Sequence, residues 1–149
     1  YEIAEPTAPE AKAHDADGDI AAALKGIRIL LVEDNPFNVV VAQEELEDAI
    51  ENVHVEVAEN GLIAVEKLRS SAFDVILMDV QMPTMNGYEA TIAIRAFDNE
   101  KAMTPIIAMT ANVLKDEVDL CYQAGMNDFI GKPFDTMELL HKINLLIKK

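Results

Sequence analysis

The chain has 149 residues, half of them hydrophobic, which suits one globular domain with a substantial core rather than a disordered segment. Its formal net charge of −15 argues against nucleic acid as a direct partner, because binding phosphates needs a basic patch, and it disfavours direct contact with anionic membranes. No apolar run approaches the ~20 residues that span a bilayer, and no secretory signal pattern opens the chain.

Residues 1–26 differ in composition from the rest of the chain. They are rich in alanine, proline and acidic residues, and they show no sustained apolar period. We therefore expect an acidic linker over residues 1–26, flexible at least to about Asp19, followed by one domain over residues 27–149. Because the chain begins with Tyr1 rather than Met, we expect it to be a piece of a longer protein.

From Ile27 onward, short apolar runs alternate with amphipathic segments of helical length. The predicted strands are "IRILLV" (27–32), "VHVEVA" (53–58), "DVILM" (74–78), "PIIAMT" (105–110) and "DFIG" (128–131). The first predicted helix begins at Pro36 with Asn35 as its N-cap, and the others cover about 60–71, 86–97, 112–124 and 135–148. Gly125 stands where a left-handed C-terminal cap is expected.

Five strands that alternate with five helices predict an α/β fold, a parallel sheet covered by helices on both faces. Near-continuous Ile, Leu and Val in most of the strands fit burial on both faces. The strand at 53–58 is the exception, since His54 and Glu56 alternate with apolar residues. This alternation predicts a half-exposed strand at the edge of the sheet.

Polar residues gather where the predicted strands end. Glu33 and Asp34 follow the first strand, Asp79 follows the third, Thr110 ends the fourth, and Lys132 follows the fifth. In open parallel sheets, ligands bind outside the carboxyl ends of the strands, at the point where the strand order reverses. We therefore expect these five side chains to meet at one edge of the sheet.

Each of these residue types has a chemical task. Three neighbouring carboxylates repel one another unless a cation neutralises them, and a few hard oxygen ligands with room for water suit Mg²⁺. Lys132 supplies a positive charge, and Thr110 supplies a hydroxyl donor. A carboxylate nucleophile, a metal, a cation and a donor are the parts of a phosphoryl-transfer site, with Asp79 as the acceptor.

Four motifs resemble the receiver domain of two-component response regulators. They are "LLVEDN" (30–35), "LMDVQMPTMNGYEAT" (77–91), "IIAMTAN" (106–112) and "AGMNDFIGKPF" (124–134), in the order and spacing of that family. The resemblance covers essentially all of residues 27–149. It implies a flavodoxin-like (βα)5 doubly wound sheet with strand order 2-1-3-4-5.

The resemblance also implies roles at the expected metal site. Asp79 matches the phosphorylated aspartate and Asp34 the main acidic Mg²⁺ ligand, with Glu33 as its acidic neighbour acting through water. Gln81, two residues after the acceptor, is expected to offer its backbone carbonyl to the metal.

Further roles follow from the second half of the family pattern. Thr110 matches the hydroxyl that moves toward the phosphoryl group, and Lys132 matches the lysine of the site. The Lys132–Pro133 peptide bond is expected to be cis. Phe129, three residues before that lysine, matches the aromatic switch position, although a core aromatic is the competing interpretation.

The motifs are most similar to receivers at the C-terminus of hybrid sensor histidine kinases. This implies a phosphorelay in which Asp79 takes a phosphoryl group from phosphohistidine and passes it to a histidine-phosphotransfer partner. The domain is then expected to catalyse its own phosphorylation and dephosphorylation, and to be cytoplasmic even within a membrane-bound parent kinase. A single-domain response regulator that acts by phosphorylation-dependent protein binding is the alternative, and the oligomeric state stays open.

Other classes of protein fit less well. A phosphatase with an aspartate nucleophile typically carries a second acid two positions later, where this chain has Gln81. A flavin-binding flavodoxin-like protein needs a phosphate loop after the first strand, where this chain has acids. A purely structural interaction module is a third alternative, separated from a receiver by whether phosphate chemistry occurs. Cys121, the one cysteine, rules out an internal disulfide, fits a reducing compartment, and is expected to be an inert helix thiol.

Overall fold

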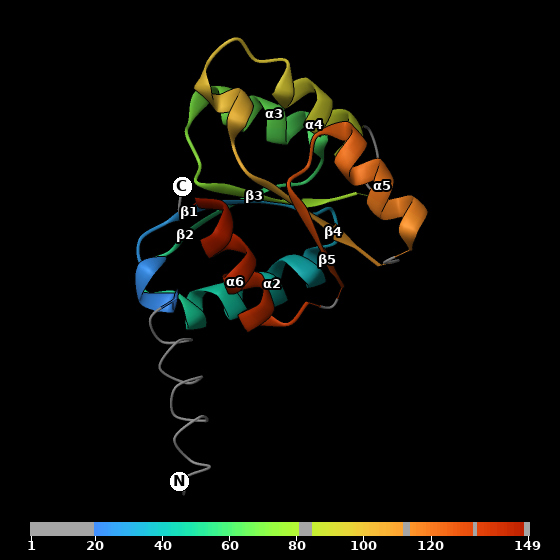
Figure 1. The fold of residues 1–149 in the computed structure, drawn as a ribbon. Helices are drawn as coiled ribbons and strands as arrows, with labels where there is room; N and C mark the ends of the chain where they lie inside the picture. Colours follow the sequence, from blue (N-terminus) through green and yellow to red (C-terminus); the bar gives the residue numbers. More distant parts are fainter. Residues whose placement is uncertain (1–19, 81–84, 112–113, 133, 148–149) are drawn as a thin grey trace, which may run out of the picture.

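One parallel sheet organises the domain (Figure 1). The computed structural model describes residues 20–80, 85–111, 114–132 and 134–147. The strands are β1 (Arg28–Val32), β2 (His54–Ala58), β3 (Val75–Asp79), β4 (Ile106–Thr110) and β5 (Asp128–Gly131). They are arranged in the order β2-β1-β3-β4-β5, all parallel, which confirms the predicted topology and the edge position of β2.

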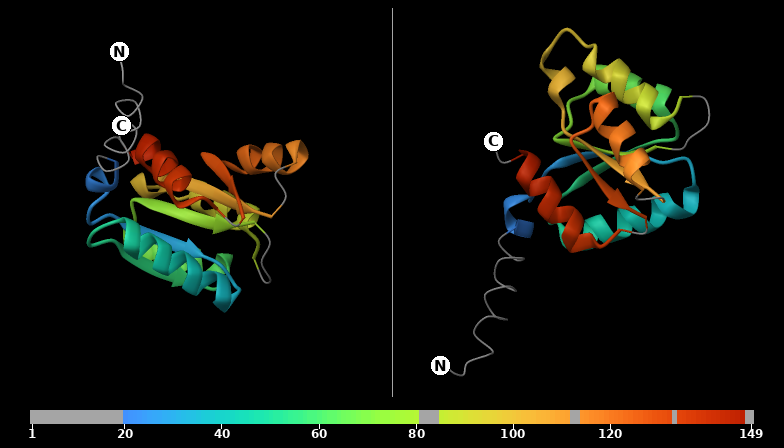
Figure 2. Two further views of the ribbon diagram at one scale, coloured as in Figure 1. Left: turned by 90° about the horizontal axis from the view of Figure 1, so that it is seen from below. Right: turned by 45° about the vertical axis from the view of Figure 1, so that its right-hand side comes forward.

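Helices cover both faces of this sheet. They are α2 (Pro36–Ala49), α3 (Gly61–Ser70), α4 (Gly87–Arg95), α5 (Lys115–Ala124) and α6 (Thr136–Ile147), with a short 3-10 turn, η1 (Glu100–Met103), before β4. Helices α2 and α6 lie on one face, and α3, α4 and α5 lie on the other (Figures 1 and 2). Among the described helices, none has the length and apolarity needed to cross a membrane.

Alternate residues of the central strands supply two separate cores. Leu30, Ile76 and Ala108 face α3, α4 and α5, whereas their neighbours Leu31 and Leu77 face α2 and α6. All residues of β3 and β4 are buried. Since successive side chains of a strand point to opposite faces, only a sheet covered on both sides accepts such continuous apolar runs.

Local sequence signals place the ends of the helices. The Asn35 side chain accepts hydrogen bonds from the backbone N–H groups of Phe37 and Asn38, so α2 begins at Pro36 as predicted. Asn86 and Glu89 form a capping box at the start of α4. Gly125 ends α5 with a φ of 112°, the left-handed conformation that the sequence predicted for it.

Residues 20–26 belong to the packed domain, although their composition grouped them with the linker. Residues 20–23 are helical, and the turn that follows buries the Leu24 side chain completely in the core beneath α2 and α6. The Gly26 N–H donates to the Glu51 carbonyl. The boundary expected at residue 26 is therefore too late, because Leu24 is buried in the core and Ile20 and Ala21 pack against it. Residues 1–19 lie outside the described part.

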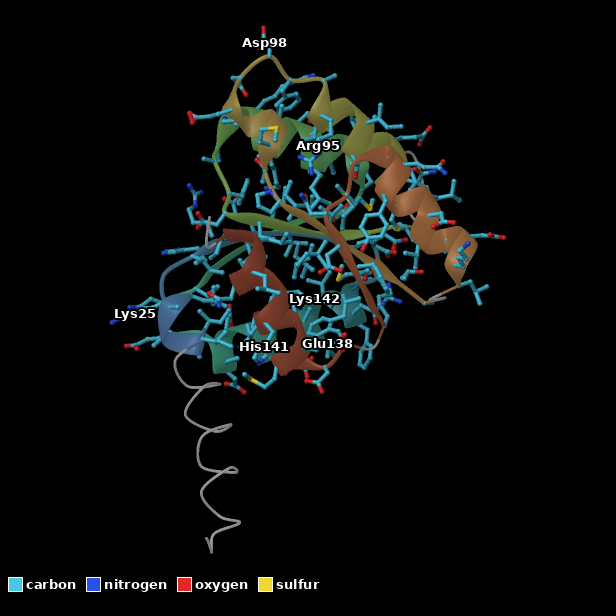
Figure 3. The ribbon with its side chains drawn as sticks, in the orientation of Figure 1. Lys25, Arg95, Asp98, Glu138, His141 and Lys142 are labelled. Atoms are coloured by element: carbon cyan, nitrogen blue, oxygen red, sulfur yellow. The ribbon has the colours of Figure 1, made fainter. Side chains whose placement is uncertain are left out.

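Arg95 joins three segments that the sequence did not suggest were connected. Its guanidinium donates to the carbonyls of Gly125, Ala102 and Thr104 at 2.7–2.8 Å and to the side chain of Asn127 at 2.8 Å. Figure 3 shows this side chain beneath the η1 region. With four oxygen acceptors, the half-buried guanidinium is satisfied without any carboxylate, so α4 is fastened to the segments that lead into β4 and β5.

The first prediction concerns the anchoring of the segment before β1. We expect Leu24→Ala to lower the free energy of unfolding by about 2–5 kcal/mol, because it removes a fully buried side chain from the α2–α6 core. Urea unfolding followed by circular dichroism measures the change. Lys25→Ala is the control, since this neighbour makes one exposed ion pair, at 3.8 Å, with Glu51. Equal stability of the two variants contradicts the assignment of Leu24 to the core.

The second prediction concerns Cys121. Its side chain on α5 is fully buried, and this burial raises the pKa of the thiol, so the reactive thiolate is scarce at neutral pH. We expect Ellman's reagent to leave the native protein unmodified and to modify one thiol after unfolding in guanidinium. Rapid modification of the native protein contradicts the inert role.

Candidate functional site

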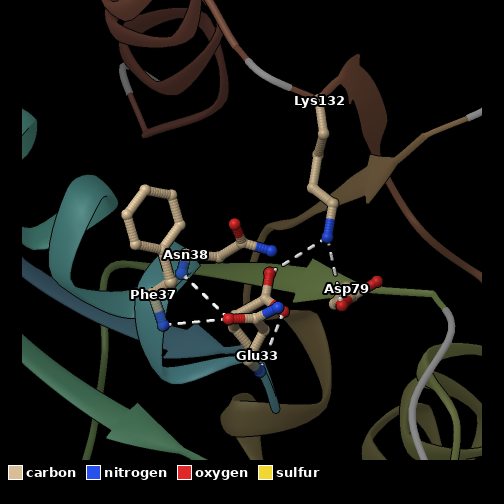
Figure 4. A network of polar contacts seen from close by, with 6 residues as sticks. Glu33, Phe37, Asn38, Asp79 and Lys132 are labelled. Atoms are coloured by element: carbon tan, nitrogen blue, oxygen red, sulfur yellow. Dashed lines mark hydrogen bonds and ion pairs between the residues drawn. The ribbon is translucent and has the colours of Figure 1, made fainter.

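The predicted polar residues converge at the carboxyl edge of the sheet. Glu33 and Asp34 follow β1 directly, Asp79 is the last residue of β3, and Lys132 follows β5. Because β1 and β4 are the two neighbours of β3, the topology places Asp79 at the centre of this edge. Figure 4 shows the side chains of Lys132, Glu33 and Asp79 directed toward one another.

The backbone around Asp79 is held from two sides. The N–H of Val80 donates to the Met109 carbonyl of the neighbouring strand at 3.3 Å, and the Gly87 N–H donates to the Val80 carbonyl at 3.3 Å. A β-carbon on Gly87 would lie 2.5 Å from the Asp79 carbonyl oxygen, so only glycine allows α4 to begin so close to the tip of β3. The acceptor carboxylate therefore projects from a rigid strand end.

Lys132 makes the central contact of the site. Its ammonium lies 3.0 Å from Glu33 Oε1 and 3.2 Å from Asp79 Oδ2 (Figure 4). Both acids are buried, with 3% of Glu33 and 4% of Asp79 exposed. Buried carboxylates are costly unless they are paired and hydrogen-bonded, and this ammonium pairs with both of them.

Protonation equilibria reflect the same contact. Burial by itself raises the pKa of Glu33, but hydrogen bonds from Lys132 and from the Asn35 N–H, with the lysine charge, outweigh burial and leave the pKa lowered. Burial by itself lowers the pKa of Lys132, yet Glu33 and Asp79 leave it raised. The charged forms of both partners are therefore favoured.

One lysine does not neutralise the whole acidic cluster. Carboxylate oxygens of Glu33, Asp34 and Asp79 all lie within 4.8 Å of one another, and Asp34 is exposed at the mouth of the site. Three carboxylates against one ammonium leave two negative charges when all are ionised. The cluster thus presents hard oxygen ligands and excess negative charge, the properties that a divalent cation requires.

Two cavities meet at this cluster. An acidic cavity of about 240 Å³ is lined by Asp34, Asp79 and Ala111, among others. An apolar cavity of about 300 Å³ lies beside α2 and is lined by Phe37 and Val41, among others. Glu33, Asn38 and Lys132 line both. A charged ligand can therefore reach Asp79 while an apolar group occupies the adjacent cavity.

Thr110 and Phe129 lie nearby but outside the acidic cavity. Thr110 is 1% exposed at the end of β4, and its carbonyl accepts from the Lys132 N–H at 2.8 Å. Phe129 is half-buried on β5, with its ring edge-to-face against Tyr122 at 6.4 Å and the Lys142 ammonium 5.3 Å from its centre. Both residues are thus placed next to the site, and the switch roles expected for them remain predictions.

Two predicted features of the site lie outside the described residues, and two residues that line the site were not predicted. The Gln81 carbonyl and the Lys132–Pro133 peptide bond lie outside the described residues. Asn38 and Ala111, which were not among the predicted site residues, also line the acidic cavity. Asn38 lies in the first turn of α2, which begins two residues after Asp34, and this position could have placed it at the same edge.

Curated relatives share most of this chain. The sensor protein GacS of Pseudomonas syringae is 38% identical over 139 residues, 92% of this chain but only 15% of its own length. The rice two-component response regulator ORR41 is 44% identical over 119 residues, covering 78% of this chain and 91% of its own length. The chain thus spans a small part of the sensor kinase and nearly all of the plant protein.

Solved structures agree with this likeness. The receiver domain of the sensor histidine kinase PA1611 from Pseudomonas aeruginosa, described with magnesium coordinated in its active-site cleft, is 41% identical, with a TM-score of 0.76 over 83% of this chain and 99% of its own. The receiver of the yeast regulator Ssk1, crystallised with the phosphotransfer protein Ypd1, is 27% identical, with a TM-score of 0.71 over 80% of this chain and 88% of its own.

A family model for the response regulator receiver domain matches residues 29–144, which include every element from β1 to most of α6. The matched region contains the acidic cluster and Lys132, and its five strands have the order 2-1-3-4-5. This chain belongs to the response regulator receiver domains of two-component signal transduction.

Proposed function

We propose that this domain accepts a phosphoryl group on Asp79 from a phosphohistidine and passes it to a histidine-phosphotransfer partner. The observation that carries this proposal is the contact of the Lys132 ammonium with a buried Asp79 carboxylate inside an acidic cavity. A structural carboxylate gains nothing from facing an open cavity lined by further acids. A phosphoacceptor requires that arrangement, because its carboxylate must reach the donor.

The side chains present divide the work of the transfer. An Asp79 carboxylate oxygen attacks phosphorus, the bond from phosphorus to the imidazole nitrogen breaks, and its electron pair leaves with the imidazole. Lys132, already 3.2 Å from Asp79 Oδ2, is within reach of the arriving phosphoryl oxygens. Thr110 supplies a hydroxyl from the end of β4. Most of the acceleration then comes from positioning and charge stabilisation.

The residues present fit Mg²⁺ as the cofactor. We assign Asp34 and Asp79 as direct ligands, Glu33 as a ligand through water, and the Gln81 carbonyl as a further ligand from outside the described residues. The clustering of three carboxylate oxygens within 4.8 Å supports this set. When bound, the ion supplies positive charge that neutralises the acids and the phosphoryl oxygens.

The partner is expected to dock over the beginning of α2. Three large apolar side chains are exposed there: Phe37 is 74% exposed, Val40 is 51% and Val41 is 40%. Phe37 and Val41 also line the apolar cavity that shares Glu33, Asn38 and Lys132 with the acidic one. An apolar helix face laid across these residues can present a phosphohistidine to Asp79.

The parent protein is best accounted for as a hybrid sensor histidine kinase, as the similarity to GacS and PA1611 suggests. The likeness to ORR41 over 91% of its length supports the second candidate, a single-domain response regulator. Transfer onward from Asp79 to a phosphotransfer histidine separates the two. A relay receiver gives up its phosphoryl group to that histidine, whereas a terminal regulator retains it until hydrolysis.

The third prediction tests phosphorylation itself. Incubation with Mg²⁺ and acetyl phosphate should add one phosphoryl group, detected by intact mass spectrometry, and Asp79→Asn should abolish the addition. Lys132→Met should slow it by about 10²-fold, since removing one preorganised charge-stabilising donor has that effect. Omission of Mg²⁺ provides the control. Unchanged phosphorylation of Asp79→Asn contradicts the assignment of the acceptor.

The fourth prediction tests the docking surface. We expect Phe37→Ala to slow transfer from a phosphorylated histidine-phosphotransfer domain about tenfold more than it slows transfer from acetyl phosphate, because interface anchors of this kind contribute more than 1 kcal/mol. Leu145→Ala, which removes a 71% exposed side chain from α6, is the matched control. If the two variants slow protein-to-protein transfer equally, the partner docks elsewhere.

A further inference from the structure

The side chain of Asn38 lies in the site but has no role in the transfer described above. Asn38 lies in the first turn of α2 and lines both the acidic and the apolar cavity. Figure 4 shows its amide directed toward the Lys132 ammonium and the Glu33 carboxylate. Asp79 lies on the far side of that ammonium and lines the same acidic cavity.

This amide does not help to hold the described part of the chain together. The Asn38 backbone N–H donates to the Asn35 side chain at 3.4 Å, as part of the cap of α2. The Asn35 amide oxygen is occupied by that cap. Among the described residues, by contrast, the Asn38 side-chain amide has no hydrogen-bond partner. An unengaged amide on a cavity wall is available to a ligand or to water.

The amide also differs chemically from its surroundings. Ionised Glu33, Asp34 and Asp79 only accept hydrogen bonds, and the Lys132 ammonium only donates them. A neutral amide does both, so its oxygen can accept a hydrogen bond from a water molecule and hold that water in one orientation. Side-chain amides orient attacking water in other phosphoryl-transfer sites.

We propose that Asn38 orients the water that hydrolyses phosphorylated Asp79; this inference rests on the proposed phosphoacceptor function. The attacking and leaving oxygens are roughly in line, so water must approach phosphorus from the side opposite Asp79. The water oxygen bonds to phosphorus, and the bond from phosphorus to the Asp79 oxygen breaks with its electron pair returning to the carboxylate. One water proton passes to a phosphoryl oxygen, and the product leaves as inorganic phosphate.

A general defect in the site would change the rates of phosphorylation and hydrolysis together, whereas loss of the Asn38 amide should change mainly the rate of hydrolysis. Phosphorylation from acetyl phosphate brings its own leaving group and needs no oriented water, whereas hydrolysis depends on one. Removal of the amide should therefore slow hydrolysis and leave phosphorylation much less affected. The amide makes no bond that holds α2, so the replacement should not unfold the domain.

The experiment uses the full chain with Mg²⁺ and radiolabelled acetyl phosphate. After removal of the free donor, loss of label from wild type, Asn38→Ala and Asn38→Leu gives the hydrolysis rate, and the initial rate of labelling gives phosphorylation. We expect hydrolysis to slow about tenfold in both variants, equivalent to about 1.4 kcal/mol, with phosphorylation changed less than twofold. Gln43→Ala, which removes an amide of α2 that lines neither cavity, should match wild type.

Four results overturn the inference. Hydrolysis within twofold of wild type in both variants shows that the amide does not orient water. Equal slowing of phosphorylation and hydrolysis shows that Asn38 acts on a feature common to both reactions. If hydrolysis slows equally in Gln43→Ala, the effect belongs to the helix rather than to the site. If wild type itself takes up no label, the phosphoacceptor function fails, and this inference fails with it.

Discussion

The ammonium of Lys132, shared between the buried carboxylates of Glu33 and Asp79, is the contact on which the rest of the site depends. Without it, two nearly dehydrated acids would face each other at the tip of the sheet, and burial would favour their neutral forms. With it, the charged forms of Glu33 and Lys132 are favoured, and Asp34 completes an acidic cluster that suits a cation. One contact thus links the stability of this edge to its chemistry.

That contact exists only because of the topology of the sheet. Glu33 and Lys132 are 99 residues apart in the chain and come from β1 and β5, which are not neighbours. Asp79 ends β3, one of the two strands between them, and is held by hydrogen bonds around Val80 and by the close approach of Gly87. Helix α2 begins at the same edge of the sheet. Its first turn carries the exposed Phe37 and the Asn38 amide. The acceptor, the docking surface and the proposed water site therefore share one rigid frame.

Patterns within single segments predicted the α/β class and the gathering of polar side chains at one edge of the sheet, whereas the strand order followed from the resemblance to receiver domains. Continuous apolar strands, Asn35 and Gly125 as caps, and the acids at the strand ends are all local signals, and the structure agrees with them. The contacts that were missed depend on distant partners. Leu24 is buried by helices far along the chain, and the acceptors of Arg95 come from separate loops. The contact of Lys132 with Glu33 was not predicted either, because it depends on the spacing of two strands that are not adjacent.

The most direct measurement is a crystal structure with Mg²⁺ and beryllofluoride, a mimic of the bound phosphoryl group. Our account predicts the adduct on an Asp79 carboxylate oxygen, the ion between Asp34 and Asp79, and the Lys132 ammonium within hydrogen-bond distance of a fluorine. Lys132 remaining on Glu33 alone, or an adduct that forms without any contact to Lys132, would contradict the role given to that lysine.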